Sequence, residues 1–488
     1  MTLSIMLMLL AMVVSAVACI ALRNRKQVTM LQPVCCLIIL ILALNVCIPV
    51  LNGETIDEGV FYMDAMSAVF MLLVGFVGLM ASIYSRAYIG LEHEEGKVNG
   101  KEQGQYYCLL IVFISVMMLT FSVRSMAIVW LGVGATTLVS TFLVGFYSSE
   151  ESTEAAWKYI ILCSVGITIA LAGFTLVYAS TVGVIGSESS LDWPALMAAA
   201  SELDPTMMKM AMVLIIVGFG TKVGFVPMHT WLPDAHSQAP SPVSGLLSAV
   251  LLNCAMYGIL RFYSISEIVN PGFASTIMLV FGLLSLGAAA FFIISARDLK
   301  RMLAYSSIEN MGLIAIGFGI GTPIAIAGAI IQMVAHSITK PILFFSAGNI
   351  IQSYGTRNMD MIRGVGRSMP FTGFMMAAGT LAIIGVPPFA VFIGELTLLS
   401  ASLESGMLWV TVLSITLLAM VFAGFVKHIF PMLTGDAGRE IEKHACFSRH
   451  APLAVLFVCT LLMGLFMPDT MKEWLGNVVS ILSGVVHL

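Results

Sequence analysis

Stretches of about 20 apolar residues recur along the whole chain, and they limit how it can fold more than any other feature. A helix needs about 20 such residues to cross the hydrocarbon core of a bilayer. Fourteen stretches reach or approach that length, near residues 3–22, 31–51, 60–84, 106–122, 125–147, 158–180, 207–227, 242–262, 272–295, 302–320, 323–352, 371–400, 406–430 and 451–467. Backbone groups inside a bilayer must be satisfied within the protein. We therefore predict an all-α polytopic membrane protein with about 14 transmembrane helices.

Composition excludes several classes of function. Only 10% of the 488 residues are charged and the mean hydropathy is +0.98, whereas soluble proteins have about 25% charged residues. No basic run or aromatic platform indicates a nucleic-acid partner. None of the nine cysteines forms a C-x-x-C pair, and no glycine-rich phosphate loop is present. We expect no metal, cofactor or nucleotide site within this chain.

The distribution of lysine and arginine predicts how the helices are oriented. With fourteen spans and the amino terminus outside, 17 of the 23 Lys and Arg residues fall inside, at 23–26, 86–101, 158, 297–301, 357–367 and 427–449. Arg124, Lys209, Arg261 and Lys472 fall outside, and two lysines lie within spans. This excess fits the positive-inside rule. Because the first apolar segment is followed rather than preceded by positive charge, we expect a retained helix and both termini outside.

One span, within residues 211–261, is interrupted by polar residues. An apolar run from Ala211 to Gly220 is followed by Lys222, and Pro227 then ends the helix. The polar link after it contains His229, Asp234, His236 and Gln238. A lysine within a span is costly unless it is paired or hydrated, and broken helices mark ion sites in transporters. We interpret Lys222 as part of an ion or proton site. The alternative is a lysine that extends to the interface from a helix end.

A second polar row lies in the eleventh span. Gln332, His336 and Lys340 are spaced four residues apart, which places them on one helix face about 6 Å apart along the axis. Histidine titrates near neutral pH, so the row suits proton transfer through water. The alternative is a histidine that joins two helices by a hydrogen bond. Glu395, in the twelfth span, either carries protons or pairs with a neighbouring helix, and the sequence leaves both open.

Two other acids have expected structural roles. Glu309 lies near the inside end of the tenth span, where we expect it to pair with the basic loop that contains Arg297, Lys300 and Arg301. Asp64 opens the third span, and we expect it at the membrane interface.

An internal repeat is visible at an offset of 161 residues. Gly224, Pro227, Trp231 and Asp234 match Gly385, Pro388, Phe392 and Glu395. Each window has a Gly-x-x-Pro break followed by an acid. Paired interrupted spans are the sequence pattern of an inverted-repeat transporter.

Several strings carry a resemblance to a known family. They are GTKVGFVPMHTWLPDAHSQAPSPVS at 220–244, LLNCAMYGILR at 251–261, DLKRMLAYSSIENMG at 298–312, HSITKPILFFSAGN at 336–349 and GVPPF at 385–389. The chain resembles the antiporter-like, proton-translocating membrane subunits of complex I, Mrp cation/proton antiporters and membrane-bound hydrogenases, and within them the hydrogenase-4 component F type. The resemblance implies two inverted five-helix repeats with helices 7 and 12 broken. The expected parts are residues 1–105 (helices 1–3), 106–262 (helices 4–8), 272–430 (helices 9–13) and 431–488 (helix 14 and tail).

The family's mid-membrane residues can be matched one by one. Lys222 fits the lysine of span seven, His336 and Lys340 fit the pair of span eleven, and Glu395 fits the acid of span twelve. Asn253 stands at the position of span eight, where it orders water but carries no charge. We also assign His229 and His236, in the polar link after Pro227, to the predicted proton or ion path. The departure is in span five, where Gly134 stands in place of the family's glutamate. Two further histidines of the family are replaced, by Asn310 and Gln332.

The resemblance implies a membrane subunit of a multisubunit redox-driven ion pump that moves protons or sodium along a mid-membrane polar axis. Two alternatives stay open. One is a degenerate, mainly structural subunit of such a complex, since the missing acid at Gly134 removes the counter-ion of Lys222. The other is a subunit of a cation/proton antiporter or ion uptake system without redox partners. Expected partners are other membrane subunits, the lipid bilayer and a peripheral redox module, which would hold the iron–sulfur and metal centres. The expected location is the plasma (inner) membrane of a prokaryote.

Overall fold

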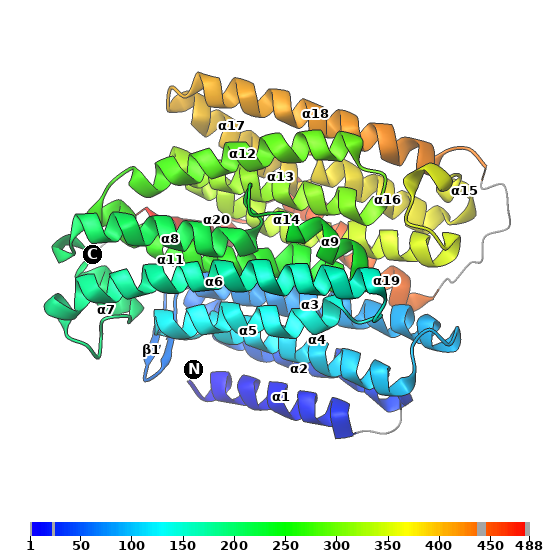
Figure 1. The fold of residues 1–488 in the computed structure, drawn as a ribbon, viewed down its shortest axis with the longest axis horizontal. Helices are drawn as coiled ribbons and strands as arrows, with labels where there is room; N and C mark the ends of the chain where they lie inside the picture. The colour runs from blue at the N-terminus through cyan, green and yellow to red at the C-terminus, as the bar shows by residue number, and fades with distance from the viewer. Residues whose placement is uncertain (1, 22–24, 437–445, 484–488) are drawn as a thin grey trace.

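The computed structural model describes residues 2–21, 25–436 and 446–483, and long helices that run roughly side by side make up most of it (Figure 1). The first part contains α1 (Thr2–Ala21), α2 (Arg25–Leu51), the strands β1 (Ile56–Glu58) and β2 (Phe61–Met63), and α3 (Ala65–Glu94). The two strands form a small antiparallel hairpin in which Ile56 pairs with Met63. The last part contains α19 (Phe447–Leu465) and α20 (Asp469–Leu482).

Two larger sets of helices lie between these parts. The first set is α4 (Gly100–Thr120), α5 (Met126–Val144), α6 (Glu150–Ile185), α7 (Trp193–Ala198), η1 (Ala200–Glu202), α8 (Pro205–Val223), α9 (Trp231–Gln238), α10 (Ser241–Leu246), the π-helical turn η2 (Leu247–Leu251) and α11 (Leu252–Val269). The second set is α12 (Phe273–Ser295), α13 (Leu299–Ile320), α14 (Pro323–Tyr354), η3 (Met359–Met361), α15 (Val365–Ser368), α16 (Pro370–Ile383), α17 (Ala390–Glu404) and α18 (Leu408–Leu433). Helix α12 packs along α13, α6 along α8, and α14 along α17.

The helical membrane architecture predicted from the sequence is confirmed. Among the described residues, 12 helices are long and apolar enough to cross a membrane. Two shorter apolar helices, Leu3–Cys19 and Pro370–Ile383, add to them. The count of fourteen spans stays a prediction. The most deeply buried helices are α3, α10–α11, α13 and α14, and these central helices carry most of the buried polar side chains described below.

The predicted break of the seventh span separates α8 from α9. Gly224 ends α8 with a φ of 91°, in the left-handed region that favours glycine. The backbone groups freed by the break are covered by protein: the Trp231 indole donates to the Thr221 carbonyl at 2.7 Å, and the amide of Val226 donates to the hydroxyl of Ser285 at 3.0 Å. Irregular backbone at membrane depth requires this kind of cover.

The second break, between α16 and α17, occurs at the matching place of the repeat. Gly385, which lies 161 residues after Gly224, also has a positive φ, of 68°. A Cβ atom at Gly385 would collide with the carboxylate of Glu395. The glycine is therefore needed twice, for the backbone conformation and for the space that the acid occupies.

Ion pairs show which loops share an end of the bundle. Asp234 of α9 contacts both Lys158 of α6 and Arg301 of α13, and Arg357 contacts Asp298 beside them. We call this end of the bundle the basic end. Basic residues from three of the segments that the sequence placed inside, 158, 297–301 and 357–367, meet there. At the opposite end, Arg124 contacts Asp57 of the hairpin and Asp192.

The expectation that Asp64 lies at the membrane interface stays a prediction, but its side chain is buried among helices. Asp64 is 2% exposed and caps α3, and it pairs with Arg261 through two hydrogen bonds, of 2.5 and 2.9 Å. Arg261, which the charge count placed outside, lies within α11 and is 1% exposed. It also donates to Ser67 and Tyr257 and stacks over the Trp193 ring. A buried guanidinium needs this full set of partners, and the partner acid is 197 residues away in the sequence.

Candidate functional site

Lys222 lies in the last turn of α8 and is fully buried. Its Nζ atom donates to the carbonyl of Val133 at 2.5 Å and to the hydroxyls of Thr136 and Thr137 at 2.5 and 2.6 Å. An ammonium group has three N–H donors, so α5 supplies an acceptor for each of them. We call these three acceptors the Lys222 cradle. The lysine does not extend to a helix end at the bundle surface, which contradicts the alternative interpretation.

Gly134, the position that lacks the family's acid, lies in α5 between the residues of the cradle. A Cβ atom there would meet Ile167 at 3.8 Å, an ordinary van der Waals contact. Within the described residues, the hydrogen-bond acceptors of Lys222 are one carbonyl and two hydroxyls, and no carboxylate is among them. Lys222 is therefore held by neutral acceptors, which take the role of the missing acid.

Lys340 is held in a similar way in the second set of helices. It lies in α14, is fully buried, and donates from Nζ to the carbonyl of Leu303 at 2.8 Å and to the hydroxyl of Ser306. Both acceptors belong to α13 and are three residues apart, as are Val133 and Thr136 in α5. Unlike Lys222, Lys340 has an acid nearby, because Glu309 of α13 is close enough for direct electrostatic attraction.

The expectation that Glu309 pairs with the basic loop is wrong. Glu309 is 1% exposed and its carboxylate accepts a hydrogen bond of 2.6 Å from Asn310. Lys300 and Arg301 instead contact the Ala239 carbonyl and Asp234. Glu309 points into the bundle, where it interacts electrostatically with Lys340 and Glu395. It is therefore a further acid beside the residues that the sequence placed on the axis.

Two amide side chains extend this acidic group. Asn310 accepts a hydrogen bond of 2.8 Å from Gln332 of α14, so Gln332, Asn310 and Glu309 form a short chain. Glu395 of α17 is 7% exposed, and its Oε1 atom has no hydrogen-bond partner among the described residues. Its carboxylate lies over the break at Gly385. Lys340, Glu309 and Glu395 are thus one amine and two acids that are buried in the second set of helices and interact electrostatically through Glu309.

The predicted histidines differ in their surroundings. His336 of α14 and His236 of α9 are fully buried, and both ring nitrogens of each have no partner within the described residues. His236 stacks on Phe344 with ring centroids 5.2 Å apart, and His336 interacts electrostatically with Lys340 and His236. His229 lies in the broken link beside Phe292 and is 8% exposed. Among the described residues, no three His, Cys, Asp or Glu side chains converge as ligands of one metal ion.

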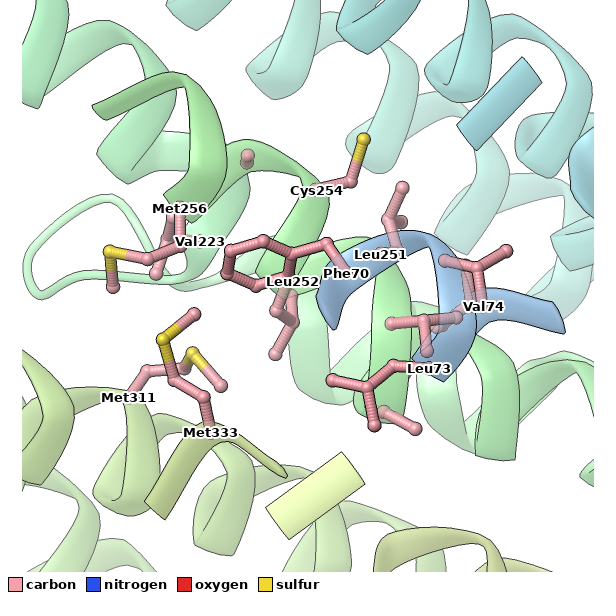
Figure 2. Close-up of a cluster of buried hydrophobic side chains, with 14 of the residues drawn as sticks. Phe70, Leu73, Val74, Val223, Leu251, Leu252, Cys254, Met256, Met311 and Met333 are labelled. Carbon is pink, nitrogen blue, oxygen red and sulfur yellow. The ribbon is translucent and has the colours of Figure 1, made fainter. Parts of the chain in front are cut away.

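Polar contacts between the two sets of helices pass through small groups. Asn253 of α11 donates to the Ser337 hydroxyl of α14 at 2.7 Å, and Ser248 and Ser307 are hydrogen-bonded at 2.7 Å. The core beside these contacts is apolar. Figure 2 shows a cluster that contains Val223, Met256, Met311 and Met333, which come from α8, α11, α13 and α14. The Asn253–Ser337 contact, the only one of these that includes a predicted site residue, therefore crosses a largely hydrophobic region.

Sequence reasoning missed two features of this site. The hydroxyls of Thr136, Thr137 and Ser306 complete the lysine contacts, yet hydroxyls are common in membrane helices and give little signal. Glu309 was assigned to the wrong partner. The available signal was its place in an apolar span, since an ionisable residue within a membrane helix is a functional candidate by default.

Comparisons with known proteins agree with this geometry. Residues 124–421 match the family model described as "NADH:quinone oxidoreductase/Mrp antiporter, TM", and residues 58–98 match "NADH-Ubiquinone oxidoreductase (complex I), chain 5 N-terminus". A hydrogenase-4 component F homolog from Methylacidiphilum infernorum is 34% identical over 417 residues, which cover 85% of this chain and 87% of the relative. F(420)H(2) dehydrogenase subunit N from Methanosarcina mazei is 30% identical, with coverage of 86% and 84%.

Solved structures share the fold. A chain of the archaeal membrane-bound sulfane sulfur reductase superposes with a TM-score of 0.86 at 21% identity, with 98% of this chain and 97% of that chain covered. A chain of the Mrp complex from Dietzia sp. superposes with a TM-score of 0.87 at 19% identity, with 100% and 98% covered. Since the first family model spans more than half of the residues, this chain belongs to the NADH:quinone oxidoreductase/Mrp antiporter family of membrane subunits.

Proposed function

We propose that this protein is an antiporter-like membrane subunit of a redox-driven ion pump and that it moves protons or sodium along a buried polar axis. The main support is the group of Lys340, Glu309 and Glu395, in which one amine and two acids lie deep in the bundle. Charged groups at such depth are costly, and in membrane proteins they mark ion and proton paths. His336, four residues before Lys340 on the same helix, adds a buried imidazole, a group that can accept and release a proton.

The two sets of helices form the proposed inverted repeats, residues 106–262 and 272–430, with 1–105 and 431–488 at the two ends of the chain. The matched breaks at Gly224 and Gly385 support this division. So does the similar contact of Lys222 and Lys340 with a carbonyl and the hydroxyl three residues beyond it.

The two repeats contribute unequally in this proposal. The first holds Lys222 among neutral acceptors, and Gly134 leaves it without an acid. The second holds both buried acids and the His336 imidazole. We propose that the second repeat carries most of the ion movement, and that Asn253 and Ser337 join it to Lys222. The alternative of a degenerate, mainly structural subunit is supported only for the first repeat, where Lys222 has no acid beside it.

The proposed partners are other membrane subunits and a peripheral redox module that holds the iron–sulfur and metal centres. Relatives with whole-chain similarity are named as a hydrogenase-4 component and as subunits of NADH-quinone oxidoreductase and F(420)H(2) dehydrogenase, which supports a redox complex. Similarity to a chain of the Mrp complex keeps the alternative of an antiporter without redox partners. The genes next to this one separate the two: hydrogenase-like or dehydrogenase genes favour the pump.

We place the protein in the inner membrane of a prokaryote with the basic end in the cytoplasm and both termini outside. The ion pairs of Lys158, Arg301 and Arg357 at one end of the bundle support this orientation, because cytoplasmic loops are enriched in Lys and Arg.

The test is proton uptake by proteoliposomes that contain the purified complex. Lys340→Ala is expected to lower uptake at least about tenfold at unchanged electron transfer, since a positioned proton-transfer group contributes about 10²–10⁴-fold. Lys222→Ala is expected to have a smaller effect. Uptake that is unchanged in both variants contradicts a role in ion movement and favours the structural alternative. Repeating the assay with sodium uptake measured in place of proton uptake shows which ion the complex moves.

A further inference from the structure

A second group of buried polar side chains lies at the basic end, away from the predicted axis residues. It contains Glu92 of α3, Tyr147 after α5, Gln352 of α14 and Arg449 of α19, and we call it the Glu92 cluster. Glu92 is 5% exposed and Arg449 is 2% exposed. Four separate parts of the chain thus bring a carboxylate and a guanidinium into a nearly dry site.

The hydrogen bonds of the Glu92 cluster are continuous. The Tyr147 hydroxyl donates to the Glu92 carboxylate, with distances of 2.7 and 2.9 Å to its two oxygens. The Gln352 amide donates from Nε2 to Glu92 at 3.3 Å and accepts from Arg449 through Oε1 at 2.6 Å. The amide therefore stands between the acid and the guanidinium, and it holds the two charges near each other.

The cluster extends toward the broken helix. Arg449 donates to Oδ1 of Asn349 at 3.0 Å, and Tyr84 donates to the same atom at 3.0 Å. A Cβ atom at Gly348 would lie 2.7 Å from the Tyr84 hydroxyl and 2.9 Å from the Ser241 hydroxyl. The absence of a side chain at Gly348 thus leaves space in which both hydroxyls lie. Ser241 begins α10 directly after the broken link.

Lys300 continues the line into the bundle. It is 3% exposed, it lies in the first turn of α13, and its Nζ atom donates to the Ala239 carbonyl in the broken link. The Ser244 hydroxyl lies 3.4 Å from the same Ala239 carbonyl and donates to the carbonyl of His236 at 2.8 Å, so Lys300 and His236 meet the same short stretch of backbone. Lys300 also interacts electrostatically with Glu92 and with His236, and His236 interacts with Lys340. The Glu92 cluster, Lys300 and His236 therefore lie around the link between α9 and α10.

On its other side, the Glu92 cluster approaches the surface. Lys97, in the loop after α3, interacts electrostatically with Glu92, and its side chain is 59% exposed. The charged and titratable groups around Glu92 are Tyr84, Tyr88, Lys97, Tyr106, Tyr147, Lys300 and Arg449. The acid thus lies between a solvated loop and the buried amine of Lys300.

We propose that Glu92 is the acid through which protons pass between the solvent at the basic end and the buried axis, by way of Lys300 and His236. This inference rests on the proposed function. The hydroxyls, amine and imidazoles along the route can each accept and release a proton without large movement. A sodium ion on the same route would pass the Arg449 guanidinium, whose permanent charge repels it, whereas a proton moves between oxygen and nitrogen atoms that stay in place. The structure therefore assigns this branch to protons.

The test compares Glu92→Gln with Glu94→Gln in the whole complex. The first substitution keeps the size of the side chain and removes its ability to carry a proton, while Glu94 is exposed two residues away and serves as the matched control. We expect Glu92→Gln to lower proton uptake by proteoliposomes at least about tenfold, with assembly and melting temperature like those of the control. Glu92→Asp should restore part of the rate. Uptake by Glu92→Gln equal to that of the control overturns the proposal.

A purely structural role predicts a different pattern, in which Glu92→Gln lowers the melting temperature and Glu92→Asp fails to restore the rate. If Glu92→Gln does not assemble, Tyr147→Phe removes only one hydroxyl from the carboxylate. It should then change the pH dependence of uptake, and an unchanged pH profile contradicts the proposal. Lys340→Ala separates this inference from the proposed function. Normal uptake in Glu92→Gln with loss in Lys340→Ala rejects Glu92 alone, whereas normal uptake in both rejects the axis as well.

Discussion

Lys222 and Lys340 lie in different helices, yet each donates to a backbone carbonyl and to the hydroxyl three residues beyond it. For Lys222 these acceptors are Val133 and Thr136 of α5, and for Lys340 they are Leu303 and Ser306 of α13. The difference between the two lysines is the acid, which is present as Glu309 beside Lys340 and has no counterpart among the acceptors of Lys222. This difference leads to the first prediction.

Gly134→Glu should supply Lys222 with a counter-ion. The base of the new side chain has room, since a Cβ atom would meet only Ile167 at 3.8 and 3.9 Å. A glycine in a helix interior also costs roughly 0.5–1 kcal/mol relative to alanine, so the helix itself gains. We expect more protons moved per electron in proteoliposomes and no loss of melting temperature. Gly134→Gln is the uncharged control. A variant that only destabilises the complex would show that another group fills this role.

Thr136→Val should weaken the Lys222 cradle. Valine has nearly the shape of threonine, so the change removes a hydroxyl acceptor at 2.5 Å from Nζ and leaves an N–H of a buried ammonium without a partner. Leaving a buried donor unsatisfied costs about 1–3 kcal/mol, which thermal unfolding of the complex measures. Thr168→Val is the matched control, because Thr168 is exposed and bonds only within its own helix. Equal melting temperatures would contradict the cradle.

Asn253→Leu should break the polar contact between the two repeats. It removes the hydrogen bond of 2.7 Å to Ser337 and puts an apolar side chain at the contact. We expect lower ion uptake with little change in electron transfer. Ser264→Ala, at another buried position of α11, controls for general effects on that helix. If Asn253→Leu and Ser264→Ala behave alike, the contact is not on the path.

Asp64→Ala should destabilise the protein without a specific effect on ion movement. It leaves the Arg261 guanidinium, 1% exposed, without its acid, and the loss of one partner of a buried pair costs about 3–5 kcal/mol. The double variant Asp64→Ala/Arg261→Met removes the second charge too, and we expect it to regain part of the lost melting temperature. A double variant no more stable than Asp64→Ala would show that Arg261 is held by its aromatic and hydroxyl neighbours instead.

Much of the fold follows from local features of the sequence. Apolar length predicted the helices, and Gly224 and Gly385 with their following prolines predicted both breaks, because these residues act on the backbone where they stand. Lys222, His336 and Lys340 were placed inside the bundle for a similar reason, since an ionisable residue within an apolar run is a local signal.

The errors concern partners. Glu309 was assigned to the basic loop nearest along the chain, yet it accepts a hydrogen bond from Asn310 and interacts electrostatically with Lys340 of the neighbouring helix. Asp64 was given no partner, yet it pairs with Arg261 from 197 residues away. Helix order predicts which segments exist but not which faces meet, so pairs across helices need the packing itself. The Glu92 cluster was missed for the same reason, as its members come from four elements.

The contact between Gly385 and Glu395 has a consequence for how this chain can vary. The carboxylate occupies the volume that any side chain at 385 would need, and the backbone there has a φ of 68° that other residues resist. A mutation at 385 therefore displaces the acid even though the acid itself is untouched. Descendants of this sequence can therefore lose the negative charge and keep the bend, but they cannot gain a side chain at 385 without moving or losing that charge.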